Sequence, residues 1–358
     1  MSASSLFSID ELIRPNIRNL KPYRSARDDF SEGVLLDANE NSLGSVVESE
    51  HELNRYPDPL QDKLREAWAD LRGIDKHQVF LGVGSDEPID LLIRMTCRPG
   101  DDNIIITPPT YGMYKVAADI NNVEVKECRL DEQFQPVPDH IRESTDANSR
   151  LLFLCSPNNP TGNLLKPESI RKILDTFQGL VIIDEAYVDF SSSASWCDEL
   201  KNYPNLVVLQ TLSKAFGMAG IRLGAAFAGK EIINYMLRMK APYNINKLTA
   251  AAGLNALSNT AVMQNFVTKL VDERHRITEA LQKSSLVTAI RPSDANFILA
   301  HFKNAKSVYQ KLAGRGVIIR YRGDQPGCEN GLRITVGTPE ENDLLLSQLN
   351  ELSHENLD

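Results

Sequence analysis

Apolar runs of strand length recur through the middle of the chain, separated by amphipathic stretches. The runs are QVFLGVG, NIIIT, VEVKECRL, RLLFLC, LVIID and NLVVLQT. Most are continuous rather than alternating, which is typical of strands buried on both faces of a parallel sheet. Between them, KPESIRKILDTFQG reads as a crossover helix, and SDEPIDLLIRMTC places Ile89, Leu92, Ile93 and Thr96 on one helical face. The pattern predicts an α/β fold with an open, mostly parallel central sheet flanked by helices over residues 75–230.

The pattern changes after about residue 245. One long helical region, predicted to be two helices, is followed by NFILAHF and GLRITVG, which read as alternating strands around a further helix. The chain has 358 residues, which exceeds the roughly 250–300 residues that a single core usually serves. We therefore expect an N-terminal arm (1–34), a large α/β domain (35–242) and a smaller C-terminal α+β domain (243–358).

Composition narrows the classes of function. The net charge is −9 and no basic run stands out, so a nucleic-acid partner has no electrostatic support. No signal peptide is recognisable, and no apolar stretch approaches the ~20 residues that span a bilayer. The five cysteines form no CxxC pair, and the six histidines lack metal-ligand spacing. We expect a cytoplasmic protein with no metal site and no membrane or nucleic-acid partner.

Ligands of open α/β sheets bind outside the C-terminal ends of the strands, so the residues that follow each run are candidates. Gly84, Ser85 and Asp86 follow the first run at the start of a helix, where free N–H groups and the helix dipole favour an anion. The same residues also suit an ordinary helix cap. Tyr111 follows the second run in PPTYGMY, and Asn159 follows RLLFLC in the turn SPNNPTG.

Asp184 ends the apolar run LVIID and is followed closely by Tyr187. A carboxylate in that position is costly unless it is paired, so Asp184 is either a functional group or the cap of the next element.

The segment TLSKAFGMAGIRLG follows the last run and gathers Thr211, Ser213, Lys214 and Arg222 among small residues. Two hydroxyls and a guanidinium suit a phosphate group. A lysine held in an apolar site has a lowered pKa and becomes nucleophilic towards carbonyls.

Together these residues fit pyridoxal phosphate. Lys214 would form the Schiff base, and Asp184 would pair with the pyridine nitrogen. Asn159 and Tyr187 would hydrogen-bond the phenolic oxygen, and Tyr111 would stack on the ring. The predicted phosphate cup consists of Gly84, Ser85, Asp86, Thr211, Ser213 and Arg222.

The chain resembles the fold-type-I aminotransferases that depend on pyridoxal phosphate, and within them the family of histidinol-phosphate aminotransferases. The resemblance rests on NLKPYRSAR, LLDANEN, NRYPDP, PPTYGMY, SPNNPTG, DEAYVDF, TLSKAFGMAGIRLG and LRITVGTPEEN, which span nearly the whole chain. The chain departs from the family pattern at Ser42, because members of the family often have a proline after NEN.

The resemblance implies transfer of an amino group between L-histidinol phosphate and 2-oxoglutarate in histidine biosynthesis, with Lys214, Asp184 and Tyr187 as catalytic residues. It implies a homodimer in which Tyr56 reaches the cofactor phosphate of the neighbouring subunit. It also implies that Arg333 binds the carboxylate of L-glutamate or the substrate phosphate, assisted by Arg320 and Tyr23, with Asn39 nearby. From the residues alone, Arg320 and Arg333 can equally be surface arginines, and Arg322 is easily confused with Arg320.

Several alternatives stay open at this stage. An aromatic-amino-acid aminotransferase, or a decarboxylase of a phosphorylated amino acid, would share the scaffold and the same arginines. A non-catalytic regulator on this fold would usually carry a DNA-binding domain, for which no helix-turn-helix pattern is present. A nicotinamide-dependent dehydrogenase is disfavoured because Glu87 stands where the third glycine of the dinucleotide fingerprint belongs.

Overall fold

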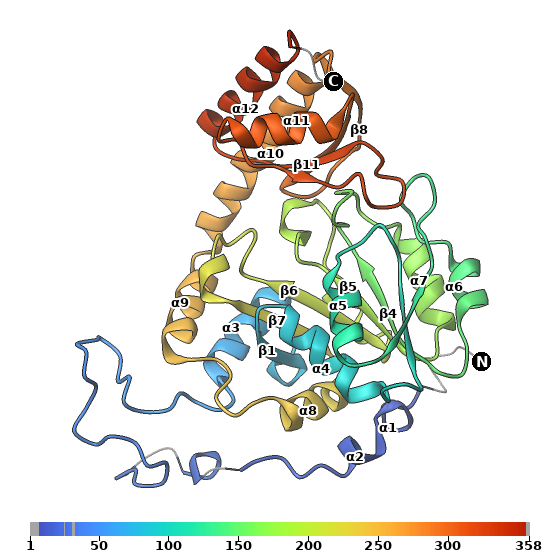
Figure 1. Cartoon of the computed structure of the whole chain (residues 1–358). Coiled ribbons are helices and arrows are strands. Elements are labelled where there is room, and N and C mark those ends of the chain that lie inside the picture. Colours follow the sequence, from blue (N-terminus) through green and yellow to red (C-terminus); the bar gives the residue numbers. More distant parts are fainter. Residues whose placement is uncertain (1–6, 25, 31–32, 356–358) are drawn as a thin grey trace.

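Two sheets organise the chain in this computed structural model, which describes residues 7–24, 26–30 and 33–355. The larger sheet has seven strands, and the smaller has four. Figure 1 shows the smaller sheet and its helices standing above the larger unit, joined to it by the long helix α10 (Thr260–Gln282).

The seven strands of the large sheet are ordered β1-β7-β6-β5-β4-β2-β3. Neighbouring strands from β3 to β6 run parallel, while β7 pairs antiparallel with both β6 and β1. The bounds are β1 (Val79–Val83), β2 (Asn103–Ile106), β3 (Glu124–Glu127), β4 (Ser149–Cys155), β5 (Leu180–Asp184), β6 (Leu206–Thr211) and β7 (Leu223–Ala228).

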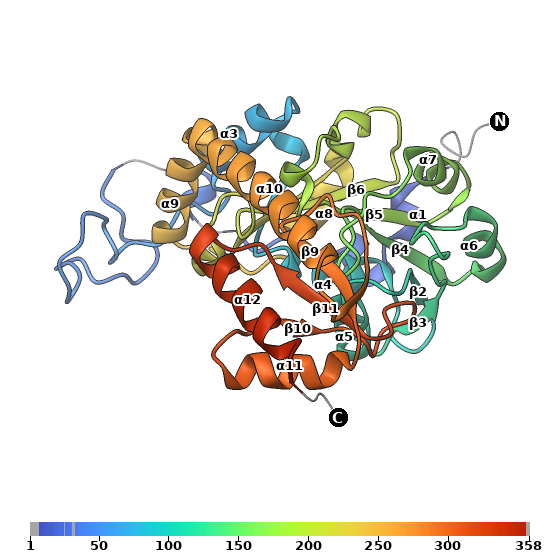
Figure 2. The same ribbon diagram turned by 90° about the horizontal axis from the view of Figure 1, so that it is seen from above.

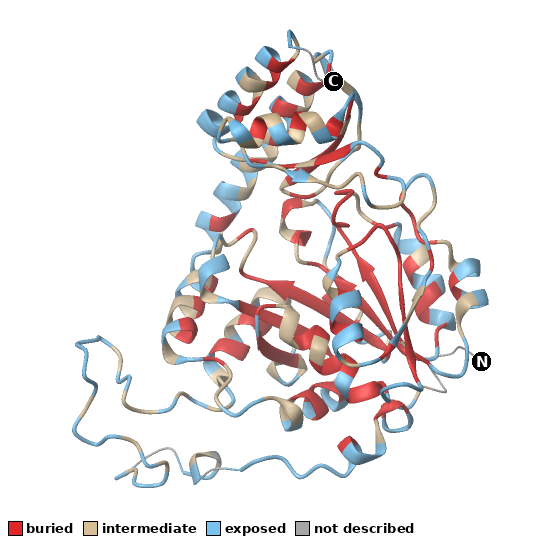
Figure 3. Cartoon of the chain, in the orientation of Figure 1, coloured by how far each residue is buried: buried red, intermediate tan, exposed pale blue. Residues whose placement is uncertain are grey.

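Helices cover both faces of this sheet, so successive strand residues enter different cores. In β6, Val207 and Leu209 pack with one set of helices, whereas Leu206 and Val208 pack with the other. The first set is α1 (Ile9–Leu12), α2 (Pro15–Arg18), α4 (Asp86–Thr96), α5 (Met113–Ile120) and α8 (Lys230–Met239). The second set is α3 (Asp62–Arg72), α6 (Pro138–Ser144), α7 (Pro167–Thr176) and α9 (Lys247–Ser258). Figure 3 shows the strands as the most continuously buried part of the molecule.

The small sheet is ordered β10-β11-β9-β8, with antiparallel pairs throughout. Its bounds are β8 (Val287–Ile290), β9 (Phe297–Phe302), β10 (Arg320–Tyr321) and β11 (Gly331–Thr335). α10, α11 (Ala305–Gly314) and α12 (Pro339–Leu352) cover one face of it.

An arm segment connects α2 to α3; we use this name for the described residues between 19 and 60. It projects away from the large sheet in both views (Figures 1 and 2). Several of its apolar side chains are almost fully exposed: Val34 (89%), Leu36 (80%), Leu43 (99%) and Val46 (100%). Within the arm, the Glu40 carboxylate pairs with Arg27 at 2.5 Å and Arg55 at 2.8 Å, which ties distant parts of the segment together.

The predicted fold class is confirmed. The six apolar runs correspond to β1–β6, and the helical region after residue 245 divides into α9 and α10 as expected. The sequence patterns did not predict β7, β8 or β10. Ala250 and Leu257 of α9 belong to the core of the large sheet, and the expected division at residues 34 and 242 stays a prediction. Among the described residues, no helix combines the length and apolar character that a membrane crossing needs.

Candidate active site

A cavity of about 150 Å³ opens at the C-terminal ends of the parallel strands of the large sheet. That is the edge where an open α/β sheet usually binds its ligand. Ten of the predicted site residues lie together in its wall. The lining comprises Ser85, Asp86, Tyr111, Cys155, Asn159, Asp184, Ala186, Tyr187, Thr211, Ser213, Lys214, Ala219 and Arg222.

Lys214 lies in the turn after β6, and its Nζ is 5.5 Å from the centroid of the Tyr187 ring. No carboxylate lies within ion-pair distance of this amine in the described part of the chain. Burial lowers the pKa of Lys214, and the positive charge of Arg333 lowers it further. The lysine is therefore more readily available as a neutral, nucleophilic amine than a surface lysine.

Asp184 is the last residue of β5, and its side chain is buried. Its Oδ2 accepts a hydrogen bond of 2.7 Å from Tyr114, and its Oδ1 accepts one of 3.1 Å from the backbone N–H of Ala186. Burial raises the pKa of Asp184, and these two hydrogen bonds oppose the rise. No lysine, arginine or histidine among the described residues pairs with it within 4 Å. A cationic ligand group would supply the missing countercharge.

Asn159 connects the cavity to the small sheet. Its Nδ2 donates to Tyr187 Oη at 3.4 Å, and its Oδ1 accepts a hydrogen bond of 2.5 Å from Arg333 Nη1. Arg333 belongs to β11, so this contact brings a guanidinium of the small unit to the rim of the cavity.

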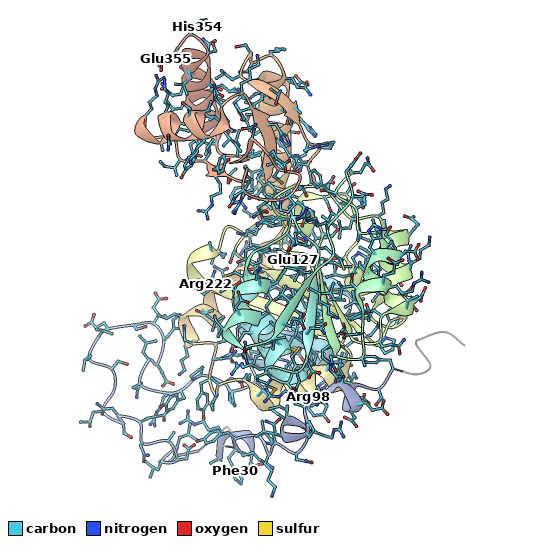
Figure 4. The ribbon with its side chains drawn as sticks, turned by 45° about the vertical axis from the view of Figure 1, so that its right-hand side comes forward. Phe30, Arg98, Glu127, Arg222, His354 and Glu355 are labelled. Atoms are coloured by element: carbon cyan, nitrogen blue, oxygen red, sulfur yellow. The ribbon has the colours of Figure 1, made fainter. Side chains whose placement is uncertain are left out.

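Four predicted cup residues lie close to one another. Arg222 Nη2 is 3.3 Å from Asp86 Oδ2, and its Nη1 is 3.4 Å from Ser213 Oγ. Gly84 has φ +68°, and a Cβ at that position would come within 2.5 Å of Arg222 Nη2. Glycine is therefore required both by the backbone and by the close approach of the guanidinium. Figure 4 shows Arg222 on the body of the large unit.

The cup lies at the N-terminus of α4, where free backbone N–H groups and the dipole favour an anion. The carboxylate of Asp86 already engages Arg222 and accepts a hydrogen bond of 3.2 Å from Tyr111. An anion bound here would share Arg222 with Asp86.

Four predicted residues lie outside the cavity of their own chain. Tyr56 stacks on Tyr243, with ring centroids 4.7 Å apart. Tyr23 lines a separate hollow that also includes Tyr243. Asn39 is exposed on the arm. Arg320 is exposed on β10, opposite Arg333 of β11.

Sequence reasoning missed Tyr114, although its hydroxyl donates a 2.7 Å hydrogen bond to Asp184. The signal was present, because Tyr111 and Tyr114 are three residues apart where α5 begins. Cys155, Ala186 and Ala219 also line the cavity and were not predicted. Nothing in their residue types distinguishes them from ordinary packing residues.

Comparison with known proteins assigns the fold and the family. The family model described as aminotransferase class I and II matches residues 27–349. A histidinol-phosphate aminotransferase of Parabacteroides distasonis is 48% identical over 346 residues, which is 96% of this chain and 99% of the relative. One of Cytophaga hutchinsonii is also 48% identical, with 96% and 99% coverage.

The solved structures agree. The histidinol-phosphate aminotransferase of Clostridium acetobutylicum superposes with a TM-score of 0.78 at 27% identity, covering 84% of this chain and 91% of that one. The enzyme of Sinorhizobium meliloti, in complex with pyridoxal-5'-phosphate, has a TM-score of 0.79 at 21% identity, with 88% and 89% coverage. At that identity the second likeness concerns the fold alone.

Proposed function

The chain belongs to the aminotransferase class I and II family, and we propose that it is a pyridoxal-phosphate-dependent histidinol-phosphate aminotransferase. The reaction transfers the amino group between L-histidinol phosphate and 2-oxoglutarate, giving imidazole-acetol phosphate and L-glutamate. The observation that carries the proposal is the position of the Lys214 amine in the strand-end cavity, which also holds the buried carboxylate of Asp184.

The residues of the cavity fit the cofactor. Asp184 pairs with no cation among the described side chains, and a protonated ring nitrogen would provide one. The start of α4, with Ser213 and Arg222, has the donors that a phosphate group needs. Thr211 Oγ1 donates to Ser213 Oγ at 2.9 Å, which fixes the position of that hydroxyl. When bound, pyridoxal phosphate supplies a carbonyl carbon that takes up the amino group and a ring that accepts electrons.

Each side chain has a separate task in this scheme. Lys214 would anchor the cofactor covalently and, once released, would carry the proton from the substrate α-carbon to the carbon that takes up the amino group. Asp184 holds negative charge at the buried end of the cavity. Asn159 and Tyr187, which are hydrogen-bonded to each other, would donate hydrogen bonds that orient the ring, and Tyr111 would cover its face. Arg333, with Arg320, binds the substrate anion.

We also propose a cytoplasmic homodimer. All five cysteines are free thiols in buried positions, as expected in a reducing compartment. The arm exposes a run of apolar side chains that a second subunit would cover. Tyr56, Tyr23 and Asn39 lie away from the cavity of their own chain, so a contribution to the site requires the neighbouring subunit.

The first experiment is a visible absorption spectrum of the cofactor-loaded protein, before and after L-histidinol phosphate, with L-phenylalanine as the matched control. We expect the band of the lysine-bound cofactor to bleach with histidinol phosphate and much less with phenylalanine. Bleaching with phenylalanine alone would retain the cofactor and overturn the substrate. If no band forms when pyridoxal phosphate is added, the assignment of Lys214 is wrong.

A further inference from the structure

The small sheet has two chemically different faces. Ile298, Ala300 and Phe302 of β9 pack with the helices of the small unit. The alternate residues of β9 point the other way, because successive strand side chains alternate between faces. Among these, Phe297 packs against Tyr187, with ring centroids 5.1 Å apart. This second face therefore looks onto the cavity of the large unit.

Three arginines share the face that looks onto the cavity. Arg333 lies opposite Leu299 of β9 and opposite Arg320 of β10 in the strand register. Arg322 continues the pairing beyond Arg320, because its backbone N–H donates a 2.8 Å hydrogen bond to the carbonyl of Gly331. Since Arg322 is two residues after Arg320, the two side chains lie on the same face. Adjacent like charges across paired strands repel one another.

Nothing in the described part of the chain neutralises this cluster. None of the three guanidinium groups has a carboxylate of residues 7–24, 26–30 or 33–355 within 4 Å. The negative charge of Asp324 acts on Arg322, but the two make no ion pair among the described residues. The Nε atoms of Arg322 and Arg333 are both buried without a hydrogen-bond acceptor. A buried donor that lacks a partner is costly, so two such donors on one face indicate an absent acceptor.

The positive charge of Arg322 also acts on Tyr187, a residue of the cavity wall. Burial lowers the pKa of Arg322, and Arg333 and then Arg320 lower it further. Burial raises the pKa of Tyr187, while the positive charges of Arg333 and Arg322 oppose that rise. Arg322 is half-buried, whereas Arg320 is exposed. The two arginines are therefore distinct, and Arg322 is the more enclosed.

We infer that Arg322 binds the phosphate group of the substrate together with Arg333, and that it is a specificity-determining residue for phosphorylated over unphosphorylated amino donors. A carboxylate is satisfied by one guanidinium fork, whereas a phosphate dianion has three oxygens and twice the charge. A second enclosed guanidinium thus favours phosphate over carboxylate. This inference rests on the proposed function for the identity of the substrate. It adds a residue two positions beyond Arg320, which the family resemblance does not carry over.

The test compares Arg322→Gln and Arg322→Lys with the native enzyme, using L-histidinol phosphate and unphosphorylated L-histidinol as paired donors. We expect Arg322→Gln to raise KM for L-histidinol phosphate roughly ten- to hundred-fold, as the loss of a charge-assisted hydrogen bond implies, with little change for L-histidinol. Arg322→Lys should recover part of the loss. Arg315→Gln is the matched control, because Arg315 pairs with Glu351 of α12 and should leave both donors unchanged.

Inorganic phosphate provides a readout that does not depend on the substrate assignment. With the cofactor cup already filled by pyridoxal phosphate, phosphate should perturb the absorption band of the native enzyme, and Arg322→Gln should weaken this binding about ten-fold or more. If phosphate binding weakens but histidinol phosphate is no substrate, the anion site stands and the proposed function fails. If both donors lose activity equally, or if phosphate binds the variant as well as the native enzyme, the inference is overturned. A melting temperature at least as high as that of the native protein excludes a folding defect, because the substitution relieves repulsion among the arginines.

Discussion

The hydroxyl of Tyr114 donates a 2.7 Å hydrogen bond to Oδ2 of Asp184 at the buried end of the cavity. Tyr114 is fully buried and stacks on Phe153, with ring centroids 4.7 Å apart. The hydrogen bond favours the ionised carboxylate and opposes the effect of burial on the pKa of Asp184. Tyr114 therefore positions the charge that the proposed mechanism requires.

Replacing Tyr114 with phenylalanine keeps the stacked ring and removes only the hydroxyl. The pKa of Asp184 should rise, because the favourable hydrogen bond to its ionised form is lost. We expect kcat to fall about ten-fold, in keeping with about 1.5 kcal/mol for a hydrogen bond to a charged group, with little change in KM. Steady-state kinetics at saturating cofactor tests this. Tyr235→Phe is the control, because its hydroxyl bonds Asp10 outside the site. An unchanged kcat in Tyr114→Phe would show that the contact has no role in positioning.

Lys214→Ala removes both the anchor and the proton carrier. We expect kcat to fall at least about a thousand-fold, because general acid–base catalysis and covalent attachment are both lost. Pyridoxal phosphate should still bind non-covalently, through the donors at the start of α4, without the absorption band of the lysine-bound form. Lys230→Ala, which loses only an exposed ion pair with Asp75, should retain turnover. Near-native turnover by Lys214→Ala would refute the assignment.

The ionisation of Lys214 should depend on Arg333. Burial is the largest cause of the lowered pKa of Lys214, and the positive charge of Arg333 comes next. The rate at which the apoprotein forms the visible band with pyridoxal phosphate should therefore rise with pH through a midpoint below that of an ordinary lysine. Removing one positive charge stabilises the ammonium form, so Arg333→Gln should move this midpoint to higher pH. If the pH midpoint of band formation stays the same or falls in Arg333→Gln, the electrostatic coupling is contradicted. Arg238→Gln, on α8, is the control.

The sequence predicted the elements and site residues that follow a local pattern. Continuous apolar runs marked β1–β6, and residues directly after strand ends supplied the wall of the cavity. Strand β7 is rich in small residues, LGAAFA, and its strand character comes from tertiary pairing with β1 and β6 rather than from a strong local pattern. Strand β10 is only two residues long, so periodicity could not reveal it.

One physical reason explains why some site residues were not predicted from the sequence. Tyr114 reaches Asp184 across 70 positions of sequence, and only the packing of α5 against the sheet creates that contact. Arg322 could not be told from Arg320 by spacing, since the difference between them is burial. Tyr23, Asn39 and Tyr56 were proposed from resemblance alone, and a single chain does not bring them to the cavity.

The arm should be held in shape by Glu40. Burial raises the pKa of Glu40, but hydrogen bonds from Arg27, Arg55 and the backbone N–H of Tyr56 outweigh it and lower the pKa to about 2. Because the folded-state pKa lies below the ordinary 4.5, its contribution is present above that value and is lost as the pH falls towards 2.

Glu40→Gln should therefore open the arm without unfolding the large sheet. The partners of Glu40 (Arg27, Arg55 and the backbone N–H of Tyr56) all lie within the arm. We therefore expect a local loss of about 1 kcal/mol rather than the larger loss of a deeply buried pair. Hydrogen exchange of residues 33–60 should accelerate at neutral pH, while exchange in β4–β6 stays unchanged. In the native protein the same acceleration should appear only in acid. Glu48→Gln, at an exposed position of the same segment, is the control, and equal exchange in the two variants would contradict the role of Glu40.

Tyr56 should act on the cavity of the neighbouring subunit. It is half-exposed and stacked on Tyr243, away from the cavity of its own chain. Tyr56→Ala should weaken cofactor affinity roughly ten-fold or more, as expected for the loss of a hydrogen bond to phosphate. If the contact crosses between subunits, a hybrid of one Tyr56→Ala chain and one Lys214→Ala chain contains one intact site. The two variants are refolded together in equal amounts, so half of the dimers are hybrids, and each hybrid has one working site of two. At limiting cofactor, the mixture should therefore recover about a quarter of the native activity. If Tyr56 acted within its own chain, every site of the hybrid would carry one defect, and mixing would give only the average of the two parental activities.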